Sequence, residues 1–124
     1  MPRHPAALAG LLAGRRATTN KAAWSWVTGV APAGASDNNI TWVPSARWTV
    51  DGRICTSSSV AAGIDMMYAL ALEAYGPAVA DAAINLIEYA LHQDPAWDPV
   101  SVVHKVPGAD GSRSLTSCVA PAGF

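Results

Sequence analysis

The stretch RWTVDGRICTSSSVAAGIDMMYALALEAY, residues 47–75, contains two different hydrophobic patterns in succession. Its first part has two β-prone runs, 47–50 and 53–56, which flank Asp51-Gly52. Asp-Gly between two such runs is typical of a β-hairpin with a type I′ turn, because both central residues of that turn need a positive φ. The first part therefore predicts a hairpin.

The second part of the stretch has apolar side chains at helical spacing and predicts a helix from Val60 to Tyr75. Three serines at 57–59 offer N-caps, and Gly76 is a natural stop. The expected buried stripe consists of Val60, Ile64, Met67, Ala71 and Tyr75, widened by Tyr68 and Leu72. A hairpin that leads into an amphipathic helix predicts an α/β layer.

Further elements are expected on both sides of this stretch. Towards the C-terminus, Pro77 opens a second helix, and residues 92–99 are irregular. The stripe of that helix is expected to be Val79, Ala82, Ala83, Leu86, Ile87 and Ala90. The other expected elements are helices at 5–13 and 22–27, strands at 17–19, 40–43 and 100–103, and a loop at 31–39. So few short strands leave a sheet edge that needs a partner.

Composition excludes several classes of protein. Only 14% of residues are charged, the net charge is −1, and the basic residues are scattered, which argues against nucleic-acid binding. No apolar run reaches the ~18 residues of a membrane span. The histidines and the two cysteines, Cys55 and Cys118, lack metal-ligand spacing, so we expect no metal, no cofactor and two free thiols in the cytoplasm.

Several motifs, in order, resemble the DJ-1/PfpI family, also described as class I glutamine amidotransferase-like, in its fungal type. Leu11-Leu-Ala-Gly-Arg-Arg-Ala-Thr-Thr19 is similar to the segment that follows the family's nucleophile helix. Residues 46–54 resemble its hairpin, and 56–65 its strand-to-helix junction. The likeness continues through Asp94-Pro-Ala-Trp-Asp-Pro99 to Pro107.

The resemblance implies a flavodoxin-like three-layer sandwich, of which this chain would be the C-terminal half with an incomplete sheet. Residues 1–107 are then expected to form a partial domain, and 108–124, rich in Gly, Ser, Ala and Pro, a disordered tail.

The resemblance also implies a cysteine nucleophile at a helix start, where the helix dipole lowers the pKa of the thiol. Counting back from Gly10-Leu-Leu12 places that position one residue before Met1, with the acidic partner farther upstream. We therefore expect no catalytic residue in this chain. Cys55 is expected to be a small buried core residue.

Six residues are expected near the family's pocket, in supporting roles: Thr18, Thr19, Asn20, Ser58, Ser59 and Asp65. The serines form a polar cluster at a helix start, which is a plausible anion site. Asp65 lies early in the same helix, where its carboxylate could accept hydrogen bonds from backbone N–H groups.

Three functions stay open at this point. The first is a truncated, inactive DJ-1/PfpI-like protein, in effect a pseudoenzyme. The second is the C-terminal part of an active isocyanide hydratase-like, hydrolase or glyoxalase-like enzyme, which alone would have a small-molecule substrate. The third is a non-catalytic module that binds a partner or forms a homodimer through its sheet edges and tryptophans.

Overall fold

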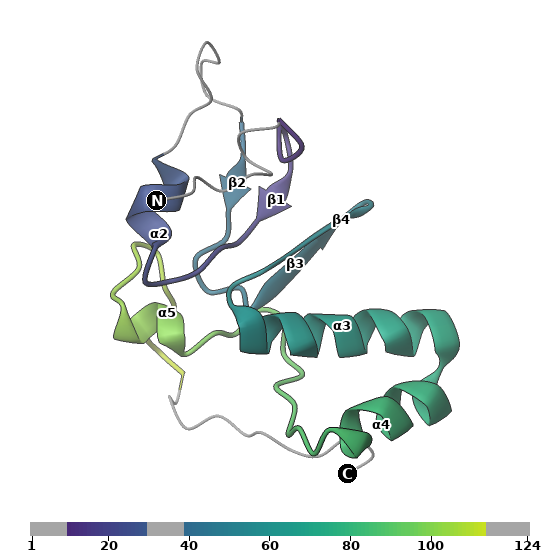
Figure 1. The fold of residues 1–124 in the computed structure, drawn as a ribbon. Helices are drawn as coiled ribbons and strands as arrows, with labels where there is room; N and C mark the ends of the chain where they lie inside the picture. The colour runs from purple at the N-terminus through teal and green to yellow at the C-terminus, as the bar shows by residue number, and fades with distance from the viewer. Residues whose placement is uncertain (1–9, 30–38, 114–124) are drawn as a thin grey trace.

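The computed structural model describes residues 10–29 and 39–113, which form a mixed arrangement of helices and strands (Figure 1). The elements are β1 (Arg16–Ala17), α2 (Trp24–Thr28), β2 (Thr41–Trp42), β3 (Trp48–Asp51), β4 (Ile54–Ser57), α3 (Val60–Tyr75), α4 (Pro77–Leu86) and α5 (Val100–Val103). This agrees with a general α/β class. Most of the helix expected at 5–13 and of the loop expected at 31–39 lies outside the described residues, and 10–14 form a turn.

The hairpin is present, but its turn differs from the expected one. Asp51 pairs with Ile54, so the two turn residues are Gly52 and Arg53 and both strands start one residue late. Gly52 has φ +60°, and Arg53 is not at positive φ. Such a pattern fits type II′ rather than type I′. Asp51 stays in the strand because its carboxylate accepts a 2.8 Å hydrogen bond from the backbone N–H of Arg16.

The described strands form two separate two-stranded sheets. β1 pairs with β2 in parallel, with Ala17 opposite Trp42, and β3 pairs with β4 antiparallel. Threonine side chains join the two sheets: Thr18 donates its N–H to Thr56 Oγ1 at 2.9 Å, and that hydroxyl lies 2.7 Å from Thr49 Oγ1. Of the strand expected at 17–19, only the first residue pairs as a strand.

α3 has the predicted bounds and caps. Ser59 Oγ accepts the N–H of Ala62, and Gly76 ends the helix at φ +81°. The helix packs against the hairpin, and α4 turns back along it (Figure 1). The Tyr68 hydroxyl donates to Asp81 across the two helices at 2.7 Å.

The prediction of the buried helix faces was wrong. α3 buries Ala62 and Asp65, and α4 buries Ala80 and Ile84. Much of the expected apolar stripe is exposed instead: Val60 (87%), Met67, Leu72, Tyr75, Val79, Leu86 (84%) and Ile87. Helical spacing identifies an apolar face but not what covers it, and α3 turns Asp65 inward because a buried arginine lies there.

The strand predicted at 100–103 is a short helix, α5. Its valines favour a strand, but Asp98-Pro99 favour a helix start, since aspartate caps the first turn and proline has a helical φ. Asp98 Oδ1 accepts the N–H of Val100 at 3.2 Å, and the Asp98 carbonyl accepts the Ser101 hydroxyl at 2.6 Å. Tertiary position and capping therefore override the β propensity of valine.

Two small apolar clusters lie on either side of the hairpin. Leu12 and Ala17 pack with Ile40, Trp42 and Ile54, and Ile84 and Leu91 pack with Ile64, Tyr68 and Tyr89. In the described part of the chain, no helix is both long enough and apolar enough to cross a membrane.

Residues 108–113, which the sequence placed in the tail, make specific contacts. Asp110 donates its N–H to Ser45 Oγ at 2.7 Å. Arg113 pairs with Asp94 at 2.8 Å and lies 4.9 Å from the ring centroid of Trp97. Residues 114–124 lie outside the described residues.

Candidate site: a buried charged network and a small cavity at the start of helix α3

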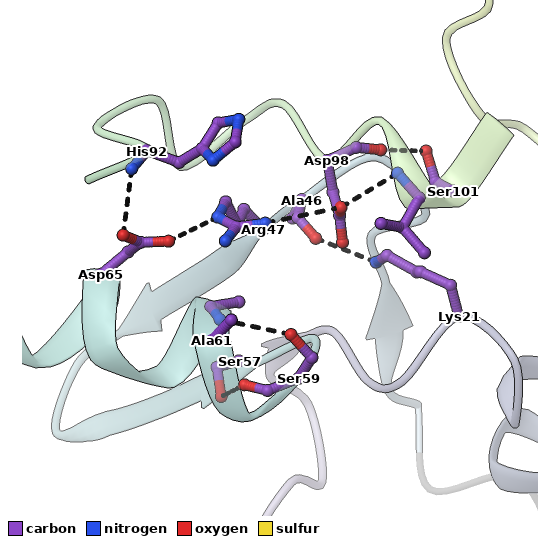
Figure 2. A network of polar contacts seen from close by, with 12 residues as sticks. Lys21, Ala46, Arg47, Ser57, Ser59, Ala61, Asp65, His92, Asp98 and Ser101 are labelled. Atoms are coloured by element: carbon purple, nitrogen blue, oxygen red, sulfur yellow. Dashed lines mark hydrogen bonds and ion pairs between the residues drawn. The ribbon is translucent and has the colours of Figure 1, made fainter. Parts of the chain in front are cut away.

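A buried arginine is the centre of the most polar region of the described interior (Figure 2). Arg47 lies just before β3, and its Nε is 2.6 Å from Asp65 Oδ2 on α3. Its Nη1 is 3.7 Å from Asp98 Oδ1, just before α5. Both aspartates are 1% exposed. Removing one partner of an ion pair this deeply buried strongly destabilises a protein. The contribution of each of these three residues to stability therefore depends on the other two.

Backbone hydrogen bonds hold the segment 92–98 against this arginine. The His92 N–H donates to Asp65 Oδ1 at 3.0 Å, so Asp65 uses both carboxylate oxygens. The Arg47 N–H donates to the Pro95 carbonyl at 2.7 Å. Burial, and then the charge of Arg47, lower the pKa of the His92 imidazole. Both effects favour the neutral form of the imidazole.

A second buried cation, Lys21, lies beside the network without an ion pair. It is 4% exposed, and its Nζ donates to Thr18 Oγ1 at 2.7 Å and to the Ala46 carbonyl at 2.9 Å. Nζ also lies 5.0 Å from the ring centroid of Trp24. Burial lowers the pKa of Lys21 to about 8, and the charge of Asp98 opposes that effect only in part. No carboxylate of the described residues lies within ion-pair distance of Lys21.

Lys21 lines a small cavity of about 100 Å³ at the N-terminus of α3. The polar side chains around this cavity belong to Asn20, Lys21, Ser58, Ser59, Asp98 and His104. Ser58 is 2% exposed, and its Oγ has no hydrogen-bond partner. A buried hydroxyl without a partner is costly and requires an explanation.

The structure places the six residues predicted from the sequence around this region in different roles. Asn20, Ser58 and Ser59 line the cavity, although Asn20 Oδ1 also accepts the Ala23 N–H. Thr18 contacts the cavity through Lys21, and Thr19 is buried outside its lining. Asp65 is tied to the cavity only indirectly, through Arg47 and Asp98.

Sequence reasoning missed the three residues that give the site its charge, namely Lys21, Arg47 and Asp98. Each stands within three residues of a tryptophan in a chain that has few charges. That proximity was the available signal, because a charge held beside a buried aromatic ring is often buried itself. The sequence does not show which charges face each other.

Cys55 lies on β4 opposite Val50 and is only half-buried, not fully buried as expected. It lines a different, shallower cavity with Leu12 and Thr56. Arg15, also near the hairpin, pairs with Asp51 at 3.2 Å. Within residues 10–29 and 39–113, no three His, Cys, Asp or Glu side chains are grouped to hold a metal ion.

The fold and the site together describe a mixed helix-and-strand protein with a buried charged network beside a polar cavity. No protein-family model matches the chain, and no curated protein matches it.

Proposed function

We propose that the chain is a DJ-1/PfpI-like scaffold that does not perform the family's cysteine chemistry with its own residues. The observation that supports the family proposal is the origin of the polar network. Lys21, Arg47, Asp65 and Asp98 come from, or directly adjoin, the four separate stretches that carry the resemblance. Motifs that are distant in sequence thus meet in one buried region, as the parts of a single domain would.

The position of Cys55 supports the absence of chemistry. The family's nucleophile stands at a helix start, where orphan N–H groups and the dipole stabilise a thiolate. Cys55, the one cysteine among the described residues, is instead in the middle of an antiparallel strand. The start of α3 carries serines and no thiol.

The test is turnover by the purified chain with an isocyanide and with a 2-oxoaldehyde. We expect no rate above that of the Cys55→Ser variant, which serves as the matched control. Turnover by the wild-type chain that the Cys55→Ser variant lacks would overturn the proposal and make Cys55 a nucleophile.

Self-association is a second candidate function, and the exposed apolar side chains of α3 and α4 favour it. A groove of about 650 Å³ runs between the helices and is lined by Ile64, Met67, Ala83 and Ile87, among others. Exposed apolar patches of this kind mark interaction surfaces in soluble proteins.

Light scattering over a wide range of chain concentrations tests this candidate. We expect a dimer that Ile87→Glu weakens, because Ile87 lines the groove, is 59% exposed, and its replacement leaves the monomer core intact. Val103→Glu is the matched control, since Val103 is an exposed valine on α5, away from the groove. A monomer at every concentration, or equal weakening by both variants, would rule out this surface.

A further inference from the structure

The cavity at the start of α3 has two features that an empty packing defect does not explain. Ser58 Oγ is buried and has no partner in the protein. Lys21 is a buried ammonium group whose two hydrogen-bond acceptors are both uncharged, and its other contact is the ring of Trp24. Both residues line the same cavity.

The charges around the cavity favour an anionic occupant. Asp98 is the one carboxylate in the cavity lining, and its Oδ1 is already engaged by Arg47 and by the N–H of Val100. Asp65 is directed to Arg47 as well. Lys21 is therefore left with no counter-charge in contact. The N-terminus of the sixteen-residue helix α3 adds a further positive end to the same cavity wall.

The volume limits the size of the anion. A cavity of about 100 Å³ has room for a small anion of a few heavy atoms. A carboxylate with one small substituent has that size, and its two oxygens can accept from Lys21 and Ser58 at once. A nucleotide is larger.

We propose that this cavity binds a small carboxylate, with Lys21 as the counter-ion and Ser58 as the hydrogen-bond donor. Asn20 and Ser59 also line the cavity. This proposal is independent of the family resemblance, because it uses only the burial, hydrogen bonding and charge of these residues.

The experiment is an NMR titration of the full chain with sodium acetate at constant ionic strength. Acetamide, which has the same shape without the charge, is the matched control ligand. We expect saturable shifts at the amides of residues 58–61 with acetate and none with acetamide. Ser58→Ala weakens acetate binding by about tenfold, the scale of one hydrogen bond to a charged group.

Ser58→Ala is the informative variant because it removes a hydroxyl that bonds to nothing in the protein, so the fold is retained. Lys21→Met abolishes binding if that variant folds. Titration calorimetry in two buffers of different ionisation enthalpy adds a second readout. Because burial lowers the pKa of Lys21 to about 8, acetate binding at pH 8 takes up about half a proton.

Three results would overturn the proposal. They are equal responses to acetate and acetamide, an unchanged acetate affinity in Ser58→Ala, and acetate binding at pH 8 without proton uptake. Any of these would show that Lys21 and Ser58 do not hold a carboxylate in this cavity as proposed.

Discussion

At the scale of single residues, Arg47 and its two aspartates form a network of three buried charges in the described interior. Removing three charged groups from water is costly, and their mutual attraction compensates only while the geometry holds. Here every oxygen of Asp65 is used, by the Arg47 guanidinium and by the His92 N–H. The network is thus more sensitive to the loss of one member than its net contribution to stability would indicate.

Asp65→Ala should therefore destabilise the chain by about 3–5 kcal/mol, since it leaves a buried guanidinium short of a partner. Urea unfolding followed by tryptophan fluorescence measures this effect. Arg15→Ala, which breaks the exposed pair with Asp51, is the control and should cause a much smaller loss. Similar losses in both variants would show that burial of the pair does not matter.

The lowered pKa of Lys21 predicts that the free energy of unfolding of the chain depends on pH. Its pKa is about 8 in the folded chain and near 10.5 in the unfolded chain. Between these values the unfolded chain binds more protons, so the contribution of Lys21 to stability rises with pH from about 8 to 10.5. The stability of the wild type relative to Lys21→Met should increase from pH 7.5 to pH 9.5, measured by urea unfolding. Parallel curves for the two proteins would contradict the burial of the ammonium group.

At the scale of elements, the junction between α3 and α4 depends on one backbone conformation. Gly76 has φ +81° and ψ 172°, a region that is essentially confined to glycine. It ends α3 and also precedes Pro77 at the start of α4. The helices can therefore turn back on each other without a loop, which brings Tyr68 within 2.7 Å of Asp81.

Gly76→Ala should destabilise the chain by about 2 kcal/mol through backbone strain alone, because a Cβ at this position meets no atom within 4 Å. Thermal unfolding followed by circular dichroism measures the change. Gly111→Ala is the control, since its Cβ also meets nothing and its φ is not in the left-handed region. A loss that is no larger than the control's would mean that the junction tolerates another conformation.

The contrast between the hairpin and α5 shows which elements can be predicted from sequence. The hairpin and α3 are specified by local signals, namely Gly52, the serine cap and Gly76, so their existence and most of their bounds follow from the residues themselves. α5 is not, because the valines and Asp98-Pro99 give opposing signals. The site can be predicted from the sequence only in part. The serines and Asn20 follow from motifs, whereas Lys21 and Asp98 come together only in the tertiary fold.

At the scale of the whole molecule, the chain has small cores joined by polar contacts. Apolar clusters lie on either side of the hairpin, and the network around Arg47 connects the segments 18–21, 45–48, 58–65 and 92–101. Which face of α3 and which face of α4 becomes buried depends on how all of these segments pack together. For that reason the periodicity of the helices predicted the wrong buried face.

The C-terminal end of the described chain also belongs to this arrangement. Arg113 covers Trp97, which is 1% exposed, and pairs with Asp94. Arg113→Ala should cost about 1 kcal/mol in urea unfolding, the scale of one cation–π contact with a surface ion pair. The exposed Arg53 supplies the control through Arg53→Ala, for which no change is expected. An equal, negligible effect of both variants would show that the contacts of Arg113 contribute nothing to stability.

The hydrogen bond between His92 and Asp65 has a consequence for the order of folding. Its two partners are 27 residues apart, whereas the hairpin and α3 are formed by neighbouring segments. Because local contacts close the shorter loops, we expect the hairpin and α3 to form first, and Arg47 to lose its water only when the segment 92–98 packs against it. The amide hydrogen of His92 is then exposed only when that late step reverses. Its exchange with deuterium follows the opening of the whole network, and this one backbone proton reports on the cooperativity of the fold.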